Sequence, residues 1–202
     1  MNRHVIAATL ACAAGITAFA QQPNKPQLPK SQLPDLGRPT QGTDEQPPFN
    51  FGEYFVGKWT FEWDAPEGSL GPSGMIKGSV VYTSLDPASD TFYEATTSAT
   101  GASGPFTIKE VVAYRKDGKT ASRWMTDSRG FSYMQVAPVG GDLGGYFNLY
   151  FDSSPFMYNG KRLRIKNAIR ITSPLRFRNT VSLSTDGGPF LNYGAVWFEK
   201  ER

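Results

Sequence analysis

The sequence has almost no cysteine and almost no histidine. Its 202 residues contain one of each, Cys12 and His4, and both lie within the first dozen positions. Residues 1–20 have the features of a secretory signal peptide, so the processed chain would have neither side chain. A Ser-His-Asp triad, a cysteine nucleophile and the usual zinc sites all need one of these residues. We therefore predict no metal site, and we exclude these chemistries from the processed protein.

The predicted signal peptide has three parts. Arg3 supplies the positive start, residues 5–19 supply the apolar run, and Ala18-Phe19-Ala20 has the small-x-small spacing that signal peptidase accepts. A transmembrane helix needs about 20 apolar residues, and this run is shorter and is followed at once by Gln-Gln-Pro. We expect an exported protein, either periplasmic or secreted.

The chain also has little net charge. It contains 21 Lys and Arg against 18 Asp and Glu, and removal of residues 1–20 takes away only Arg3, which leaves 20 against 18. So small an excess does not drive attraction to nucleic acid, and we expect no nucleic-acid partner. Because no disulfide can form in the processed chain, its stability must come from burial and hydrogen bonding.

Residues 21–50 are rich in proline. They hold seven of the fifteen prolines and almost no large apolar residue before Phe49. Such a segment cannot bury enough surface to offset the entropy lost on ordering, so we predict a disordered, extended linker. The folded domain is expected over residues 51–202, beginning with a short helix or plug around residues 53–56.

From Gly57 onward, the apolar residues recur with a period of two. Turn-forming residues interrupt them about every eight to twelve positions, which is typical of antiparallel strands joined in sequence. Asp117-Gly118, Asn159-Gly160 and Asp186-Gly187-Gly188 favour tight reversals. The pattern predicts ten strands, over residues 58–64, 74–83, 91–99, 106–115, 120–127, 131–137, 145–151, 162–172, 177–184 and 192–199.

Ten sequential strands in one sheet leave two open edges unless the sheet curls shut. We therefore predict an all-β fold, a closed antiparallel up-and-down barrel of about ten strands. A sandwich of two sheets is the competing architecture. Residues 162–172 show the expected alternation between an aliphatic inner face that includes Asn167 and a cationic outer face. The outer cations, which would suit contact with an anionic surface, are Arg162, Arg164, Lys166 and Arg170.

Glu94 and Glu110 are the leading candidates for acid/base catalytic residues. If the loop over residues 100–105 joins paired strands, the two fall opposite or nearly opposite each other, and Glu110 lies on an otherwise apolar face. Two carboxyl groups in such a place can exchange protons with a substrate. With Tyr114 assisting, they would serve a cofactor-free isomerase, hydratase or lyase, and this is the alternative to simple binding.

Arg123 can lie beside Glu110. A two-residue turn at Asp117-Gly118 pairs Val112 with Arg123 and aims Arg123 inward, whereas one bulged residue aims Trp124 inward instead. The sequence leaves both registers open. An inward Arg123 would form a buried ion pair with Glu110, and such pairs are either structural or bind polar groups of a ligand.

Other polar residues lie on faces that can be internal. In a mostly apolar cavity they orient a ligand, or they bond to one another or to buried water. Gln135 belongs to this group, and Trp63, on the same face as Trp59, is expected to line a pocket. We therefore predict that the barrel binds a small, largely apolar or amphipathic molecule. The candidate binding residues are Trp63, Glu94, Glu110, Tyr114, Arg123, Tyr133, Asn148 and Asn167.

The two ends of the predicted barrel resemble the lipocalin-like, or calycin, barrels. The first strand opens with Gly57-Lys58-Trp59, and the last runs into Trp197-Phe198-Glu199-Lys200-Glu201-Arg202. In those barrels a Gly-x-Trp closes the base, and a basic residue near the chain end packs over the indole, whose quadrupole attracts a cation. The resemblance implies that Gly57, Trp59 and either Arg202 or Lys200 close this barrel.

Three segments are more narrowly similar to an uncharacterised bacterial family of exported or cytosolic lipocalin-like domains. They are Phe-Val-Gly-Lys-Trp at 55–59, Ser-Arg-Trp-Met-Thr-Asp-Ser-Arg-Gly at 122–130 and Ser-Thr-Asp-Gly-Gly at 184–188. The resemblance covers most of residues 51–202 and implies a barrel with an internal pocket but no established reaction. Haem-binding relatives hold iron through a histidine, which the processed chain lacks, so we expect no haem and no other cofactor.

Overall fold

The structure is a computed structural model that describes residues 48–141 and 146–202. The predicted signal peptide and nearly all of the predicted linker lie outside the described residues. The elements are α1 (Phe51–Phe55), β1 (Gly57–Ala65), β2 (Gly74–Ser84), β3 (Phe92–Gly101), β4 (Gly104–Arg115), β5 (Thr120–Asp127), β6 (Phe131–Gly141), β7 (Phe147–Ser153), β8 (Phe156–Tyr158), β9 (Lys161–Ser173), β10 (Arg176–Thr185) and β11 (Leu191–Lys200).

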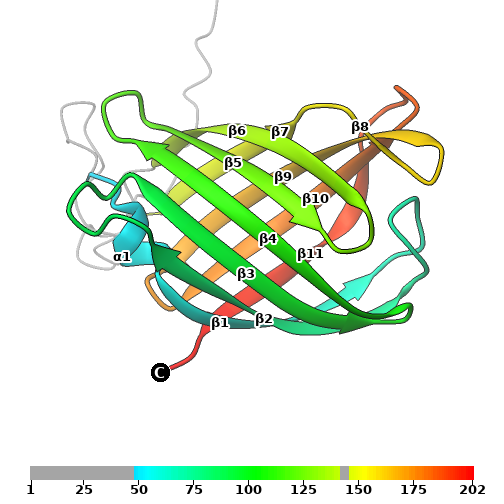
Figure 1. Cartoon of the computed structure of the whole chain (residues 1–202), viewed down its shortest axis with the longest axis horizontal. Coiled ribbons are helices and arrows are strands. Elements are labelled where there is room, and N and C mark those ends of the chain that lie inside the picture. The colour runs from blue at the N-terminus through cyan, green and yellow to red at the C-terminus, as the bar shows by residue number, and fades with distance from the viewer. Residues whose placement is uncertain (1–47, 142–145) are drawn as a thin grey trace, which may run out of the picture. The chain divides into compact units, whose positions relative to one another are not determined.

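Ten of the strands close into an antiparallel barrel (Figure 1). Strands β1 to β7 pair in sequence, β7 pairs with β9, and β9 pairs with β10. The ring is completed because β10 pairs with β11 and β11 pairs with β1. The predicted fold class is therefore confirmed, and the sandwich alternative is wrong.

All ten predicted strands are present. The one that was not predicted is β8, a short strand that pairs with β9 beyond the end of β7. The Asn159-Gly160 reversal between β8 and β9 takes positive φ at both residues, 48° and 73°, as a tight hairpin requires. At the β4–β5 turn the positive φ of 43° falls on Lys119 rather than on Gly118.

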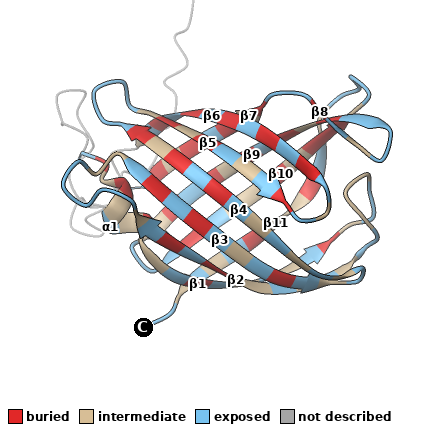
Figure 2. Cartoon of the chain, viewed as in Figure 1, coloured by how far each residue is buried: buried red, intermediate tan, exposed pale blue. Residues whose placement is uncertain are grey.

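One end of the barrel is filled by the segment around α1. Buried and exposed residues alternate along the strands (Figure 2), which places the apolar set inside. Phe51 and Phe55 of α1 are buried in this interior against Tyr82, Tyr93 and other aromatic rings. Asn50 caps the helix by accepting a hydrogen bond from the Glu53 backbone N–H at 3.1 Å. The predicted short helix or plug is confirmed.

Trp59 lies at the junction of this plug and the first strand. Its side chain is fully buried, and its indole Nε1–H donates to the Phe55 carbonyl at 2.8 Å. The Lys200 Nζ lies 5.2 Å from the indole centroid, and burial lowers the pKa of this lysine. Gly57, at φ 128°, leaves room for Lys200, since a Cβ there would meet the lysine Cε at 2.7 Å.

The implied role of Arg202 in closing the barrel is therefore wrong. Lys200 is the residue over the indole, because it pairs directly with Trp59 between β11 and β1. Arg202 lies two residues beyond the last strand and is exposed. The expectation for Gly57 and Trp59 agrees with these contacts.

Candidate functional site

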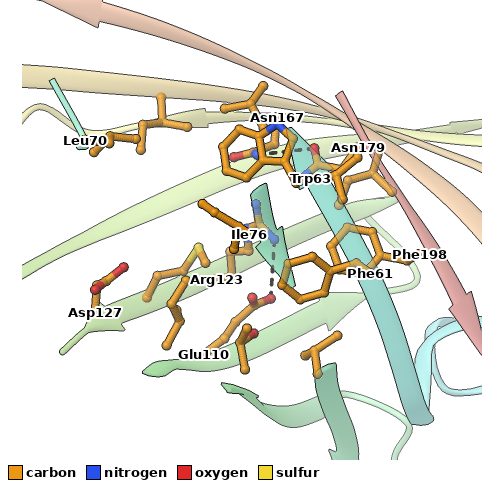
Figure 3. Close-up of a pocket in the computed structure, with 18 of the residues that line it drawn as sticks. Phe61, Trp63, Leu70, Ile76, Glu110, Arg123, Asp127, Asn167, Asn179 and Phe198 are labelled. Carbon is orange, nitrogen blue, oxygen red and sulfur yellow. Dashed lines mark hydrogen bonds and ion pairs between the residues drawn. The ribbon is translucent and has the colours of Figure 1, made fainter. Parts of the chain in front are cut away.

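A cavity of about 150 Å³ lies inside the barrel. None of the plug residues lines it, and most of its walls are apolar. Figure 3 shows aromatic and aliphatic side chains gathered around a few polar ones. The apolar walls include Phe61, Trp63, Leu70, Ile76, Tyr133 and Phe198.

Five polar residues from five strands form one connected set, which we call the polar layer: Glu110, Arg123, Gln135, Asn167 and Asn179. Arg123 Nε donates to Gln135 Oε1 at 2.8 Å, and Gln135 Nε2 donates to Asn167 Oδ1 at 2.9 Å. Asn167 Nδ2 then donates to Asn179 Oδ1 at 3.2 Å. All but Gln135 line the cavity. The layer gives the cavity a hydrogen-bonding side within an otherwise apolar interior.

Arg123 lies inward, so the two-residue register is confirmed. Val112 pairs with Arg123 between β4 and β5, and Trp124 is 52% exposed on the outer face. Arg123 Nη1 lies 3.5 Å from Glu110 Oε1, and the two side chains are only 6% and 8% exposed. The guanidinium also stacks over the Phe151 ring, 4.1 Å from its centroid.

A second ion pair lies at the cavity wall, between Asp127 and Arg129. Arg129 Nε and Nη2 donate to the two carboxylate oxygens of Asp127 at 2.9 and 2.7 Å. Its Nη1 donates to the Leu70 carbonyl at 3.4 Å, which ties the loop between β1 and β2 to the barrel. Burial alone would lower the pKa of Arg129, but the hydrogen bonds and charge of Asp127 outweigh it, and the pKa is raised.

Two tyrosines add phenol groups to the cavity lining. Burial raises the pKa of Tyr133 to about 12, and burial also raises the pKa of Tyr82. Both phenols are therefore protonated at neutral pH and present a hydrogen-bond donor. Neither supplies a base at that pH.

Glu94 and Glu110 are nearly opposite each other, as predicted, but they do not form a carboxyl pair because they lie on opposite faces of the sheet. The β3–β4 hairpin pairs Gly101 with Gly104, which sets Glu94 opposite Val111 and Glu110 opposite Ala95. Because neighbouring positions on a strand face opposite sides, Glu110 points inward and Glu94 points outward. Glu94 is exposed and accepts a hydrogen bond from Thr83 Oγ1 at 3.2 Å.

Tyr114 and Asn148 also lie away from the cavity. Tyr114 is buried, but at the plug, where its hydroxyl donates to the Phe49 carbonyl at 3.2 Å. Asn148 lies between the inward Phe147 and Leu149, so it belongs to the outer face and pairs with Arg170. The predicted positions of these two residues in a pocket are wrong. Trp63, Glu110, Arg123, Tyr133 and Asn167 do line the cavity.

The lining residues that sequence reasoning did not propose include Leu70 and three charged or amide side chains, Asp127, Arg129 and Asn179. Alternation would have found two of them, since Asp127 continues the inward set from Arg123 and Asn179 lies between the inward Phe177 and Val181. Leu70 gave no such signal, because it reaches the cavity from a loop. Arg129 follows β5 and likewise lies outside the strand pattern.

The basic residues of β9 lie on the outer face, as predicted. Arg164 and Lys166 pair with Asp152 of the neighbouring β7 at 2.9 and 3.7 Å. Both cations also approach the Phe190 ring. Contact of this face with an anionic surface stays a prediction.

Among the described residues, His, Cys, Asp and Glu do not gather in any group of three or more that would suit a metal ion. The described part of the chain also contains no helix with the length and apolar character needed to cross a membrane.

No protein-family model matches the chain, and no curated protein matches its sequence. Among solved structures it is similar to Rv2717c from M. tuberculosis, with 15% identity and a TM-score of 0.60 over 73% of this chain and 93% of that one. A fluorescence-activating β-barrel designed de novo gives 13% identity and a TM-score of 0.43 over 76% and 99%. A redesigned barrel, mFAP1, bound to DFHBI, gives 12% and 0.39 over 76% and 100%. At this identity the likeness to Rv2717c shows the fold alone.

Proposed function

We propose that this barrel binds a small, largely apolar molecule in its interior cavity. The observation that carries the proposal is the combination of apolar walls with a polar layer whose members, apart from the half-buried Asn179, are buried. Small-molecule sites are concave and mostly apolar, with a few placed polar groups that fix orientation. An apolar cavity of roughly 150 Å³ accommodates a single ring such as benzene.

The acid/base alternative has little support from this geometry. Of its three candidate residues, Glu94 faces outward and Tyr114 lies at the plug, so Glu110 alone lines the cavity. Glu110 is held in a buried ion pair with Arg123, and a carboxylate in such a pair is occupied by a structural or ligand-binding contact. Binding without transformation is therefore the function that we propose.

Filling the cavity tests this function. Ile76 lines the cavity, whereas its neighbour Met75 is 48% exposed on the outer face of the same strand. We expect single-ring probes such as toluene and phenol to bind the unmodified protein, measured by calorimetric titration. Ile76→Phe should weaken each probe at least tenfold, because the larger ring occupies the space.

Met75→Phe is the matched control for this change. It adds a ring of the same size outside the barrel and should leave every affinity unchanged. If Ile76→Phe binds the probes as tightly as the unmodified chain does, the interior cavity is not the binding site.

We also propose that the chain is exported and belongs with the lipocalin-like domains that its motifs resemble. The signal features of residues 1–20 support export. Mass spectrometry of the protein from its source should give a chain that begins at Gln21. A chain that retains residues 1–20 would contradict export by this route.

A further inference from the structure

The charges that line the cavity compensate one another. The described lining contains two carboxylates and two guanidinium groups, and each carboxylate is paired with one arginine: Glu110 with Arg123, and Asp127 with Arg129. A charged ligand would bring an additional, uncompensated charge into this interior, which is costly. The cavity therefore suits an uncharged ligand.

The two pairs differ in how much of their hydrogen-bonding capacity the protein uses. Asp127 accepts from Arg129 through both oxygens, and Arg129 uses its third nitrogen on the Leu70 carbonyl. This pair has little capacity left for a ligand. It is better placed to hold the loop that carries Leu70 over the cavity.

The Glu110–Arg123 pair is different. Its N–O separation of 3.5 Å is longer than the roughly 2.7–2.9 Å of a charge-assisted hydrogen bond. Within the described residues Glu110 accepts no hydrogen bond, and Arg123 donates only through Nε. Both side chains are more than nine-tenths buried. Buried groups of this kind normally have hydrogen-bond partners, so the pair offers an acceptor and a donor side by side.

One oxygen atom can satisfy both groups. An atom about 2.8 Å from each of them completes a triangle whose third side is the 3.5 Å separation of Arg123 Nη1 and Glu110 Oε1. That atom must donate to the carboxylate and accept from the guanidinium. A hydroxyl group does both, whereas a carboxylate cannot donate and a hydrocarbon can do neither.

We propose, on the basis of the binding function above, that the cavity takes an uncharged single-ring molecule whose one hydroxyl group bridges Glu110 and Arg123. The class comprises phenols and cyclic alcohols. The ring lies against the apolar walls, where Phe61 and Phe198 already pack with centroids 4.9 Å apart. The cavity size limits the ligand to about one ring.

Three probes of nearly equal size test this proposal on the full chain at pH 7. Phenol carries the neutral hydroxyl, toluene lacks it, and benzoate replaces it with a charge. Calorimetric titration should give phenol an affinity at least tenfold higher than that of toluene and of benzoate. If toluene binds as tightly as phenol, the hydroxyl proposal fails while the binding function stands. If benzoate binds most tightly, the neutral-ligand argument fails, and if no probe binds, both proposals fail.

The Glu110→Gln variant should reverse the order of the phenol and benzoate affinities. It removes the charge that compensates Arg123, so benzoate should now bind at least tenfold more tightly than phenol. Glu94→Gln makes the same change on the outer face and should preserve the original order. A folded Glu110→Gln protein that still prefers phenol would overturn the assignment of the hydroxyl to this pair. Should that variant fail to fold, the ranking of the three probes on the unmodified chain decides the proposal alone.

Discussion

Replacing Arg123 by methionine is expected to lower the free energy of unfolding by about 3–5 kcal/mol. The change leaves the buried Glu110 carboxylate without its compensating charge and takes the donor from Gln135 Oε1. Charges removed from water without a partner are strongly unfavourable. Urea unfolding followed by tryptophan fluorescence measures the loss.

A second substitution identifies the cause. The double variant Arg123→Met, Glu110→Leu removes both charges and should recover at least half of the lost stability, because an apolar pair of similar volume replaces a buried ion pair at little cost. Arg178→Met, on the exposed outer face, should change stability by no more than about 0.5 kcal/mol. Equal losses in the single and double variants would show that the buried charge is not responsible.

Replacing Trp59 by alanine is expected to cost a similar amount, about 3–5 kcal/mol. Trp59 is fully buried, packs edge-on against Phe177 at 4.7 Å, and hydrogen-bonds the end of α1 through Phe55. The substitution opens a space between the plug and the barrel wall and removes the cation–π contact of Lys200. The melting temperature and the urea concentration at the midpoint of unfolding should both fall.

Trp124→Ala is the matched control, since it removes the same side chain from an outer position that is 52% exposed. Surface changes of this kind usually stay within about 0.5 kcal/mol. A comparable loss in both variants would mean that burial at the plug does not determine the contribution of Trp59. The comparison separates the role of the closing tryptophan from a general effect of losing an indole.

Most of the barrel could be predicted from the sequence because the period-two apolar pattern and the turn-forming residues gave the same strand boundaries. Strand β5 shows this: its period-two pattern gave its bounds at residues 120–127, and the turn before it narrowed the register to two choices, of which the pairing of Val112 with Arg123 is the one that forms. The short β8 gave no such signal, since three residues are too few to establish alternation. Strand β8 forms because β9 extends beyond the end of β7 and leaves a free edge with which residues 156–158 can pair.

The candidate site was predicted less completely, for two physical reasons. The first is register: Glu94 and Glu110 were placed opposite or nearly opposite each other, and the offset of one residue that the hairpin has puts their side chains on different faces of the sheet. The second is position along the barrel axis. Tyr114 is on the inner face, but the plug at Phe49 covers it, and no pattern within β4 shows how deep that plug reaches.

Residues brought together from distant segments were the hardest to predict. Gln135 and Asn167 are hydrogen-bonded across a strand that lies between theirs, and Leu70 reaches the cavity from a loop. The alternation identified Gln135 and Asn167 as inward polar residues but could not show that they belong to one layer. That grouping depends on the curvature of the closed sheet.

The pairing of β1 with β11 means that one edge of β1 stays unpaired until the end of the chain has been synthesised. Thr60 and Glu199, which meet across this pairing, are 139 residues apart, so the first strand emerges from the ribosome long before its last partner. Until then its backbone is an open edge that can pair with other chains. Contacts of such high sequence separation also slow folding. A chain cut short before residue 191 would therefore form an open sheet with two unpaired edge strands, each able to pair with other chains, rather than a smaller barrel.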